Sequence, residues 1–266
     1  MLDWRTYTAD PTDRGATLRM DAYLRSITRL EPKARIEMIL GFCENADVLD
    51  IGAGEHDLSF YSEEGWEHGR IKRVAKRAVA IEINPKLCEH YNAKGFDFRC
   101  VDATSDADLG ERFDRVFIGD VIEHVNDPVA LLSFAKRHLR ENGRVLVTTP
   151  NPFAPRFKRH RAQMRTRYVM ANLEHTRWVS ISNMHEVAWR AGMELVALRW
   201  PMWKKPKQGI ARDLALFGRR CLLAIAPLED VFAEYAFELA APKETRSLHE
   251  ADAALRSVGR ERDESA

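Results

Sequence analysis

Short apolar runs alternate with amphipathic segments along most of this chain. Apolar runs typical of β-strands cover residues 48–51, 78–81, 96–101, 114–118, 143–150, 194–200 and 232–239. Apolar residues at three- and four-residue steps predict helices over residues 16–30, 31–43, 68–75, 84–91, 127–139 and 182–191. Strands that alternate with helices of this length predict an α/β fold with a doubly wound, mostly parallel, seven-stranded sheet.

Turn and capping residues sharpen several of these boundaries. Asn84 is a suitable N-cap and Pro85 suits the first helical position, while Gly95 suits the end of that helix. Asn142 and Gly143 are expected to close the helix that begins at Asp127 and to turn the chain into the fifth strand.

Acidic residues stand at the ends of three successive strands. Asp50 lies in the first strand just before Gly52 and Gly54, Glu82 ends the second, and Asp102 follows the third. In an open α/β sheet, the carboxyl ends of the strands form the edge where ligands bind. Glycine is needed in such a loop because the backbone turns sharply and lies close to the ligand.

The segment Asp50–Gly54 has the form Asp-x-Gly-x-Gly, and the sequence resembles the class I S-adenosylmethionine-dependent methyltransferases over residues 35–200. Residues 113–125 and 143–150 are similar to the family's fourth- and fifth-strand motifs. The resemblance implies a Rossmann-like fold and an S-adenosyl-L-methionine cofactor, with Glu82 on the ribose hydroxyls and Asp102 near the adenine amino group. The implied cofactor-binding residues are Asp50, Gly52, Ala53, Gly54, Glu82, Ile83, Asp102, Ala103, Asp120 and Val121.

The sequence departs from the family pattern in two places. Glu55 and His56 follow Gly54, where many members carry another small residue. Glu82 also follows Asp50 by 32 residues, against roughly 20 in dinucleotide-binding relatives. Residues 61–73 are therefore interpreted as an insertion or an extended first helix.

Overall composition favours a soluble protein without a metal centre. Net charge is +1 and 30% of residues are charged, which gives no overall attraction to nucleic acid. The four cysteines have no paired spacing, so neither a zinc site nor a disulfide framework is indicated. No signal-peptide pattern and no apolar run of roughly 18 residues is present, so a cytoplasmic location is expected.

The charge is unevenly distributed. Residues 152–220 contain fifteen Lys or Arg against four acids. Such a segment is either a solvated surface or a surface for an anionic partner, which includes a charged small molecule or glycan acceptor. Residues 199–223 mix aromatic, basic and apolar positions, so peripheral membrane contact and acceptor binding both remain open.

Candidate catalytic residues are His175 and His124. Methyl transfer to an alcohol requires removal of the hydroxyl proton, most often by His, Asp or Glu. His124 follows Asp120 and Glu123 after the fourth strand, and the alternative role for it is to support that loop. His175 follows the basic segment, where Asn151 and Arg177 are candidates for acceptor contact. His160 and His185 are expected at the surface.

These observations predict a methyltransferase, and they favour oxygen over nitrogen as the atom that is methylated. The acceptor classes are a small molecule, a sugar or a polysaccharide-pathway compound, as in the similar bacterial natural-product and cell-surface enzymes. After the fourth strand, base methyltransferases usually carry a four-residue motif that binds a flipped base. This chain has Gly119-Asp120-Val121-Ile122 there, which disfavours base methylation and leaves ribose methylation open. A non-catalytic nucleotide-binding module is the other alternative, although GxGxxG and GxxxxGK[ST] are lacking.

The expected organisation has three parts. Residues 1–45 form an N-terminal helical cap, residues 46–242 the main domain with a basic insertion at about 152–180, and residues 243–266 a charged tail without stable structure. The oligomeric state stays open at this stage.

Overall fold

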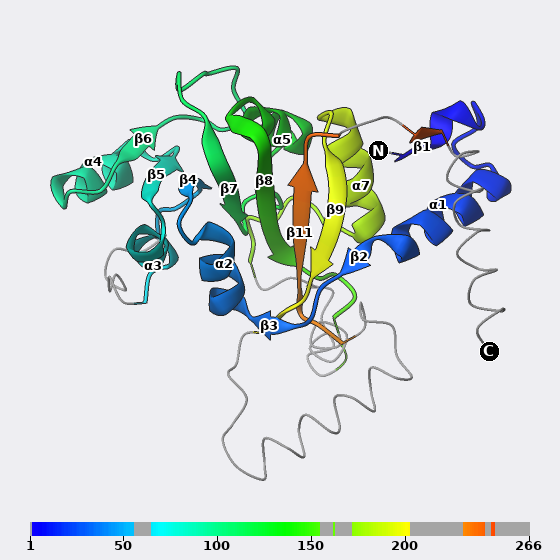
Figure 1. The fold of residues 1–266 in the computed structure, drawn as a ribbon, viewed down its shortest axis with the longest axis horizontal. Helices are drawn as coiled ribbons and strands as arrows, with labels where there is room; N and C mark the ends of the chain where they lie inside the picture. The colour runs from blue at the N-terminus through cyan, green and yellow to red at the C-terminus, as the bar shows by residue number, and fades with distance from the viewer. Residues whose placement is uncertain are drawn as a thin grey trace, which may run out of the picture.

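The computed structural model describes residues 2–55, 65–154, 162, 172–202 and 231–242, together with the backbone of residues 246–247. Its centre is an eight-stranded sheet in the order β2-β9-β11-β8-β7-β4-β5-β6 (Figure 1). The strands are β2 (Thr28–Arg29), β4 (Asp47–Ile51), β5 (Arg77–Glu82), β6 (Phe98–Cys100), β7 (Phe113–Gly119), β8 (Leu139–Pro150), β9 (Glu194–Arg199) and β11 (Glu234–Ala240). Two short parallel pairs lie outside it: β1 (Leu2–Asp3) with β12 (Arg246–Ser247), and β3 (Lys33–Ala34) with β10 (Pro201–Met202).

The direction of the strands explains where a ligand site can form. Strands β6, β5, β4, β7 and β8 are parallel, whereas β11 is antiparallel to both β8 and β9. The chain runs outward from β4 to β6 and returns to β7 on the other side of β4. That reversal is a topological switch point, the usual ligand site of an open α/β sheet. The predicted doubly wound, seven-stranded sheet is confirmed, with the two-residue β2 as an additional edge strand.

Helices cover both faces of the sheet because its strands are apolar on both sides. The α-helices are α1 (Arg14–Ser26), α2 (Arg35–Cys43), α3 (Glu67–Val74), α4 (Pro85–Ala93), α5 (Pro128–Arg137) and α7 (Ile181–Arg190), and a 3-10 helix spans Trp4–Thr6. In β4, Leu49 and Ile51 pack in the core beneath α5 and α7. Val48 points the other way and packs with α2 and α3. Asp50 shares that second face, which directs its side chain toward α3.

Three predicted helix boundaries were wrong. Helix α1 ends at Ser26 instead of residue 30, because Thr28 and Arg29 pair with β9. Helix α2 begins at Arg35 instead of residue 31, because Lys33 and Ala34 pair with a distant strand. Helix α5 ends at Arg137, and Asn142 and Gly143 lie inside β8 near a shift in its pairing with β7. Asn142 has φ 63°, so the turn signal marks an irregular stretch of strand. The predicted Asn84 cap is confirmed, since its side chain accepts a hydrogen bond from the Lys86 amide.

The expectation that His185 is a surface residue was also wrong. Its side chain is buried in α7, and its ring meets the Tyr23 ring of α1 edge-on at a centroid distance of 5.5 Å. This ring contact joins α1 to α7, and local periodicity does not reveal it. Within the described residues, no helix has both the length and the hydropathy needed to cross a bilayer.

Several predictions fall on parts of the chain outside the described residues. These are most of the basic insertion with His160, most of the membrane-contact segment 199–223, residues 61–64 of the expected insertion, and nearly all of the tail. Residues 67–73 of that insertion belong to α3.

Candidate active site

The loop after β4 is shaped by two glycines at the carboxyl edge of the sheet. Gly52 has φ 77°, and a Cβ there would clash with the Val121 side chain from the loop after β7. A Cβ on Gly54 would lie 2.6 Å from Glu82 Oε2. Side chains at either position would therefore displace neighbours that belong to the site. Ala53 lies between them and is buried.

Glu82 fixes this loop from the neighbouring strand. Its Oε2 accepts a hydrogen bond from the Gly54 amide at 3.2 Å. Its Oε1 accepts from the amides of Ile83 and Asn84, each at 2.9 Å. The carboxylate thus stands at the end of β5 with a fixed orientation. The next side chain, Ile83, is 66% exposed and offers an apolar surface beside it.

The Asp50 carboxylate lies under the glycine loop. Asp50 Oδ2 is 2.9 Å from His68 Nδ1 of α3, and both side chains are buried. Trp66, just before α3, donates a hydrogen bond through its indole nitrogen to the Ala53 carbonyl at 2.7 Å. The sequence predicted Asp50 at this site but not its partner His68, because α3 follows a segment of irregular spacing.

Asp102 and Ala103 lie in the turn after β6. Asp102 is exposed, and its Oδ1 accepts hydrogen bonds of 2.7 Å from both the amide and the hydroxyl of Thr104. Ala103 is half-buried. The topology therefore brings these two residues to the same sheet edge as Glu82 and the glycine loop.

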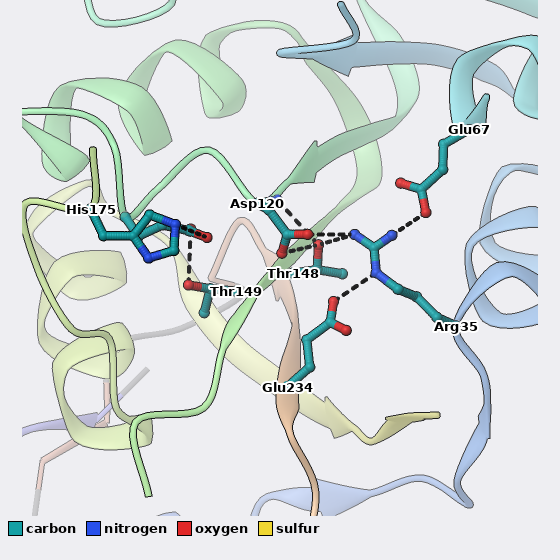
Figure 2. Close-up of polar contacts among 8 residues, drawn as sticks. Arg35, Glu67, Asp120, Thr148, Thr149, His175 and Glu234 are labelled. Carbon is teal, nitrogen blue, oxygen red and sulfur yellow. Dashed lines mark hydrogen bonds and ion pairs between the residues drawn. The ribbon is translucent and has the colours of Figure 1, made fainter. Parts of the chain in front are cut away.

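A buried arginine gathers three carboxylates at the ends of β7 and β11. Arg35, the first residue of α2, donates from Nε to Glu234 Oε1 at 2.7 Å and from Nη2 to Asp120 Oδ2 at 2.9 Å. It also donates to Thr148 Oγ1 at 3.0 Å and forms an ion pair with Glu67 (Figure 2). Sequence analysis missed this Arg35 cluster. The one available signal was Glu234, a charged residue at the start of a mostly apolar strand.

The Arg35 cluster places three carboxyl groups around one guanidinium group. Burial raises the pKa of Glu67 to about 7 and that of Glu234 to about 8, although Arg35 opposes both shifts. Asp120 has φ 52° and is held there by Arg35 and by Thr148, whose hydroxyl donates to Asp120 Oδ1 at 3.2 Å. Because about a third of the Asp120 and Glu67 side chains is exposed, these two can attract a positively charged part of a ligand.

A second cluster lies on the other side of Asp120 and consists of Glu123, His124 and His175. Glu123 is buried, and its Oε2 accepts a hydrogen bond of 2.9 Å from the Thr149 hydroxyl. Its Oε1 is 3.9 Å from His175 Nε2. The His124 and His175 rings stand perpendicular at a centroid distance of 4.6 Å. Figure 2 shows Asp120 between His175 and Arg35.

Hydrogen bonds made by the two residues after His175 hold it in this position. The amide of Thr176 donates to the Glu123 carbonyl at 3.0 Å, and Arg177 donates to the Asn126 carbonyl at 2.7 Å. The predicted candidates His124 and His175 are therefore brought together with Glu123. Asn151 is buried, and its side-chain amide bonds to the Phe232 carbonyl and the Phe153 amide, which gives it a structural role.

The electrostatics of the histidine cluster favour proton transfer near neutral pH. Burial and the nearby Asp120 raise the pKa of Glu123 to about 7. Burial and the nearby His124 lower the pKa of His175. Within the described residues, His175 Nδ1 and Glu123 Oε1 are buried without a hydrogen-bond partner. Such atoms either take up a proton or coordinate a ligand.

The same three residues offer one donor atom each within 4.8 Å of one another, a spacing that could hold a metal ion. A carboxylate and two imidazoles form a donor set that zinc and similar first-row ions accept. The histidine cluster can thus serve as a proton acceptor or as a metal centre.

Comparison with known proteins identifies related sequences. Residues 19–198 match a family model described as "Methyltransferase domain". A ubiquinone biosynthesis O-methyltransferase from Parvibaculum lavamentivorans is 35% identical over 111 residues, which cover 41% of this chain and 42% of that protein. An (S)-coclaurine N-methyltransferase from Thalictrum flavum is 22% identical over 131 residues, or 47% of this chain and 36% of that protein. The matches thus span less than half the length of these curated relatives.

One similar solved structure is a protein from Thermotoga maritima, described as an S-adenosylmethionine-dependent methyltransferase and a possible histamine N-methyltransferase. Its TM-score is 0.51 at 14% sequence identity, and the alignment covers 90% of this chain and 98% of that one. At this identity the likeness supports the same fold.

Proposed function

The chain belongs to the S-adenosylmethionine-dependent methyltransferases, and on that basis we propose that it methylates a hydroxyl oxygen of a small-molecule acceptor. The observation that supports oxygen as the acceptor atom is the pair of Glu123, which is buried, and His175, whose side chain is 9% exposed, at the carboxyl edge of the sheet. A hydroxyl must lose a proton during methylation, whereas a neutral amine can attack first and lose its proton later. A base fixed beside the cofactor site is therefore most useful to an O-methyltransferase.

The cofactor is proposed to lie across the switch point. Glu82 would accept hydrogen bonds from the ribose hydroxyls, and Asp102 would accept one from the adenine amino group. Ile83 and Ala103 would flank the adenine ring. The glycine loop and Val121 would line the centre of the molecule. The exposed parts of Asp120 and Glu67 favour the positively charged methionine end of S-adenosylmethionine. Asp50 would act indirectly, by holding the glycine loop through His68.

The proposed reaction is an in-line displacement at the methyl carbon. S-adenosylmethionine, when bound, would supply the methyl group: its carbon–sulfur bond would break as the bond to the acceptor oxygen forms, with S-adenosylhomocysteine as the leaving group. His175 Nδ1 takes the hydroxyl proton, and Glu123 stabilises the imidazolium through Nε2. This arrangement requires the His175 tautomer with its proton on Nε2, which the 3.9 Å approach of Glu123 Oε1 favours. His124 packs against the base and holds its ring.

We propose a small hydroxylated molecule as the acceptor. Relatives named as O-methyltransferases of ubiquinone biosynthesis support a small hydroxylated molecule. A sugar or polysaccharide-pathway acceptor rests on the Glu123-His124 pair after β7 and on the basic segment, most of which lies outside the described residues. Both classes belong in an acceptor screen, which should also include an RNA oligonucleotide for ribose methylation.

The test measures S-adenosylhomocysteine formation with phenols, catechols, sugars, nucleotide sugars and amines. Once an acceptor is found, we expect His175→Gln to lower kcat by roughly 10²- to 10⁴-fold while S-adenosylmethionine affinity stays unchanged. Asp106→Asn, a change at an exposed carboxylate, is the matched control. A His175→Gln variant with full kcat would contradict the base assignment, and turnover of amines alone would contradict the choice of oxygen.

Chelation separates the two chemical roles of the histidine cluster. Full activity in EDTA supports His175 as the base. Activity that EDTA removes and a first-row divalent ion restores would assign the cluster to a metal and overturn the base assignment.

A further inference from the structure

Two cysteine thiols meet beside the proposed ribose site. Cys88 lies in α4 and is buried, whereas Cys100 is exposed at the end of β6. Each thiol lies beside one of two consecutive carbonyl groups, those of Glu82 and Ile83, which brings the two sulfurs close together. Neither thiol has a role in the proposed methyl transfer, and the two are separated in sequence by the whole α4–β6 connection.

Both thiols also touch the short loop that carries Glu82. Cys88 Sγ lies 3.5 Å from the Glu82 carbonyl oxygen, and Cys100 Sγ lies 3.8 Å from the Ile83 carbonyl oxygen. Cys100 is the strand partner of Glu82 in the β5–β6 ladder. The thiol pair therefore lies against residues 82–83, whose carboxylate and apolar side chain are proposed to bind adenosine.

We propose that Cys88 and Cys100 form a reversible intramolecular disulfide that weakens S-adenosylmethionine binding. A disulfide requires a sulfur–sulfur distance of about 2.05 Å, so both cysteine side chains must shift away from these carbonyls and toward each other. That shift removes both thiol contacts to the Glu82 and Ile83 carbonyls. It also disturbs the three amide bonds that orient the Glu82 carboxylate. This second consequence rests on the proposed role of Glu82.

The oxidation can proceed by exchange with a low-molecular-weight disulfide. The exposed Cys100 loses its proton and attacks one sulfur of that disulfide, which releases one thiolate and leaves a mixed disulfide. Cys88 then loses its proton and attacks the Cys100 sulfur, which releases the second thiolate. The two protein thiols lose two electrons and two protons in total, and the small disulfide is reduced to two thiols.

The second step should be slow at neutral pH. Burial, followed by the neighbouring Cys100 and by Glu82, raises the pKa of Cys88 to about 12. The reactive thiolate is therefore scarce, and its fraction increases about tenfold for each unit by which the pH rises toward that value. Closure of the disulfide is expected to accelerate accordingly between pH 7 and 9.

The experiment incubates the full chain with glutathione disulfide at pH 7, 8 and 9 and then identifies cross-linked tryptic peptides by mass spectrometry. We expect a Cys88–Cys100 link that Cys100→Ser abolishes and that Cys43→Ala, a change at a buried cysteine of α2, leaves intact. Calorimetry on the same samples should show S-adenosylmethionine affinity falling about tenfold on oxidation and recovering with dithiothreitol.

Each outcome has a separate meaning. If no Cys88–Cys100 peptide forms at any pH, the modification site is wrong. If the link forms and affinity is unchanged, its effect on the cofactor is wrong. Reduced Glu82→Gln protein shows which assignment failed, because unchanged affinity in that variant would overturn the Glu82 role while leaving disulfide formation intact.

Discussion

At the scale of single residues, Glu82 links the glycine loop to the proposed ribose site. Its two carboxylate oxygens accept hydrogen bonds from three backbone amides at the edge of the sheet. A carboxylate is the stronger acceptor for amides and for ribose hydroxyls, since charged hydrogen bonds are roughly twice as strong as neutral ones. We expect Glu82→Gln to raise the S-adenosylmethionine Kd at least about tenfold at 25 °C, measured by calorimetry.

The matched control for this prediction is Glu89→Gln. Glu89 is an exposed acid of α4, close in sequence but not at the edge of the sheet. It changes net charge by the same amount, so it should leave the Kd unchanged. Equal weakening in both variants would mean that overall charge, not the ribose contact, governs affinity.

The Glu123–His175 pair predicts how activity depends on pH. The pKa of Glu123 is raised to about 7 and that of His175 is lowered. His175 is thus already neutral where Glu123 is still partly protonated. Since only ionised Glu123 stabilises the imidazolium, kcat should rise as pH increases through about 7.

Glu123→Gln tests this assignment. The variant cannot ionise at residue 123, so its kcat should be lower and should no longer rise through pH 7. Its remaining pH dependence should come from His175, below the ordinary pKa of about 6.5. A Glu123→Gln profile that still rises through pH 7 would show that another group controls the reaction.

At the scale of secondary-structure elements, the Arg35 cluster joins α2, α3, β7, β8 and β11. The pKa of buried Glu234 is raised from 4.5 to about 8 on folding, so the folded chain holds a proton that the unfolded chain releases. Stability should therefore fall as pH rises from about 4.5 through about 8, by roughly 1.4 kcal/mol per pH unit for a single carboxyl. Glu67 contributes in the same direction.

Chemical denaturation at pH 6, 7 and 8 measures this slope. Glu234→Gln should reduce this slope, because glutamine keeps an acceptor for Arg35 and does not titrate, whereas the contribution of Glu67 should remain. Glu238→Gln is the control from the same strand, where the carboxylate bonds to Arg199. A wild-type free energy of unfolding that rises from pH 6 to 8 would show that Glu234 is ionised in the folded chain.

These elements also show what sequence can and cannot predict. The helices and the strands of the large sheet, other than β2, were recognisable because burial on one or both faces leaves a local periodicity. Glu82 and Asp102 were recognisable as candidate site residues because the carboxyl ends of parallel strands lie at the same edge of the sheet. The contact of Arg35 with Glu234 joins residues 199 positions apart, and neither has a local pattern that specifies its partner. The position of His175 likewise depends on hydrogen bonds between segments that are far apart in the sequence.

At the scale of the whole molecule, the N-terminal segment is integrated with the main domain. It supplies β2 to the large sheet and Arg35 to the site, so contacts cross the predicted domain boundary at residues 45–46. The division into a cap and a main domain stays a prediction. Figure 1 places α1 and β1 at one end of the sheet and α3 and α4 at the other.

This separation predicts that the N-terminal end affects stability without affecting the cofactor. Leu2 is buried, and the Arg5 guanidinium lies 3.9 Å from the Trp189 ring centroid and pairs with Glu186 of α7. A Leu2→Ala, Arg5→Ala double variant should lose about 2–4 kcal/mol of unfolding free energy. Its S-adenosylmethionine Kd should stay within about twofold of wild type, since a change confined to the far end removes no cofactor contact.

Leu18→Ala provides the control for that experiment. Leu18 belongs to the same N-terminal region but is 61% exposed on α1, so its truncation should leave stability within about 0.5 kcal/mol. Chemical denaturation and calorimetry on the three proteins separate the two effects. If the double variant loses cofactor affinity in proportion to stability while remaining folded, the two ends of the sheet are coupled. The N-terminal segment would then belong to the binding machinery through Arg35 and α2.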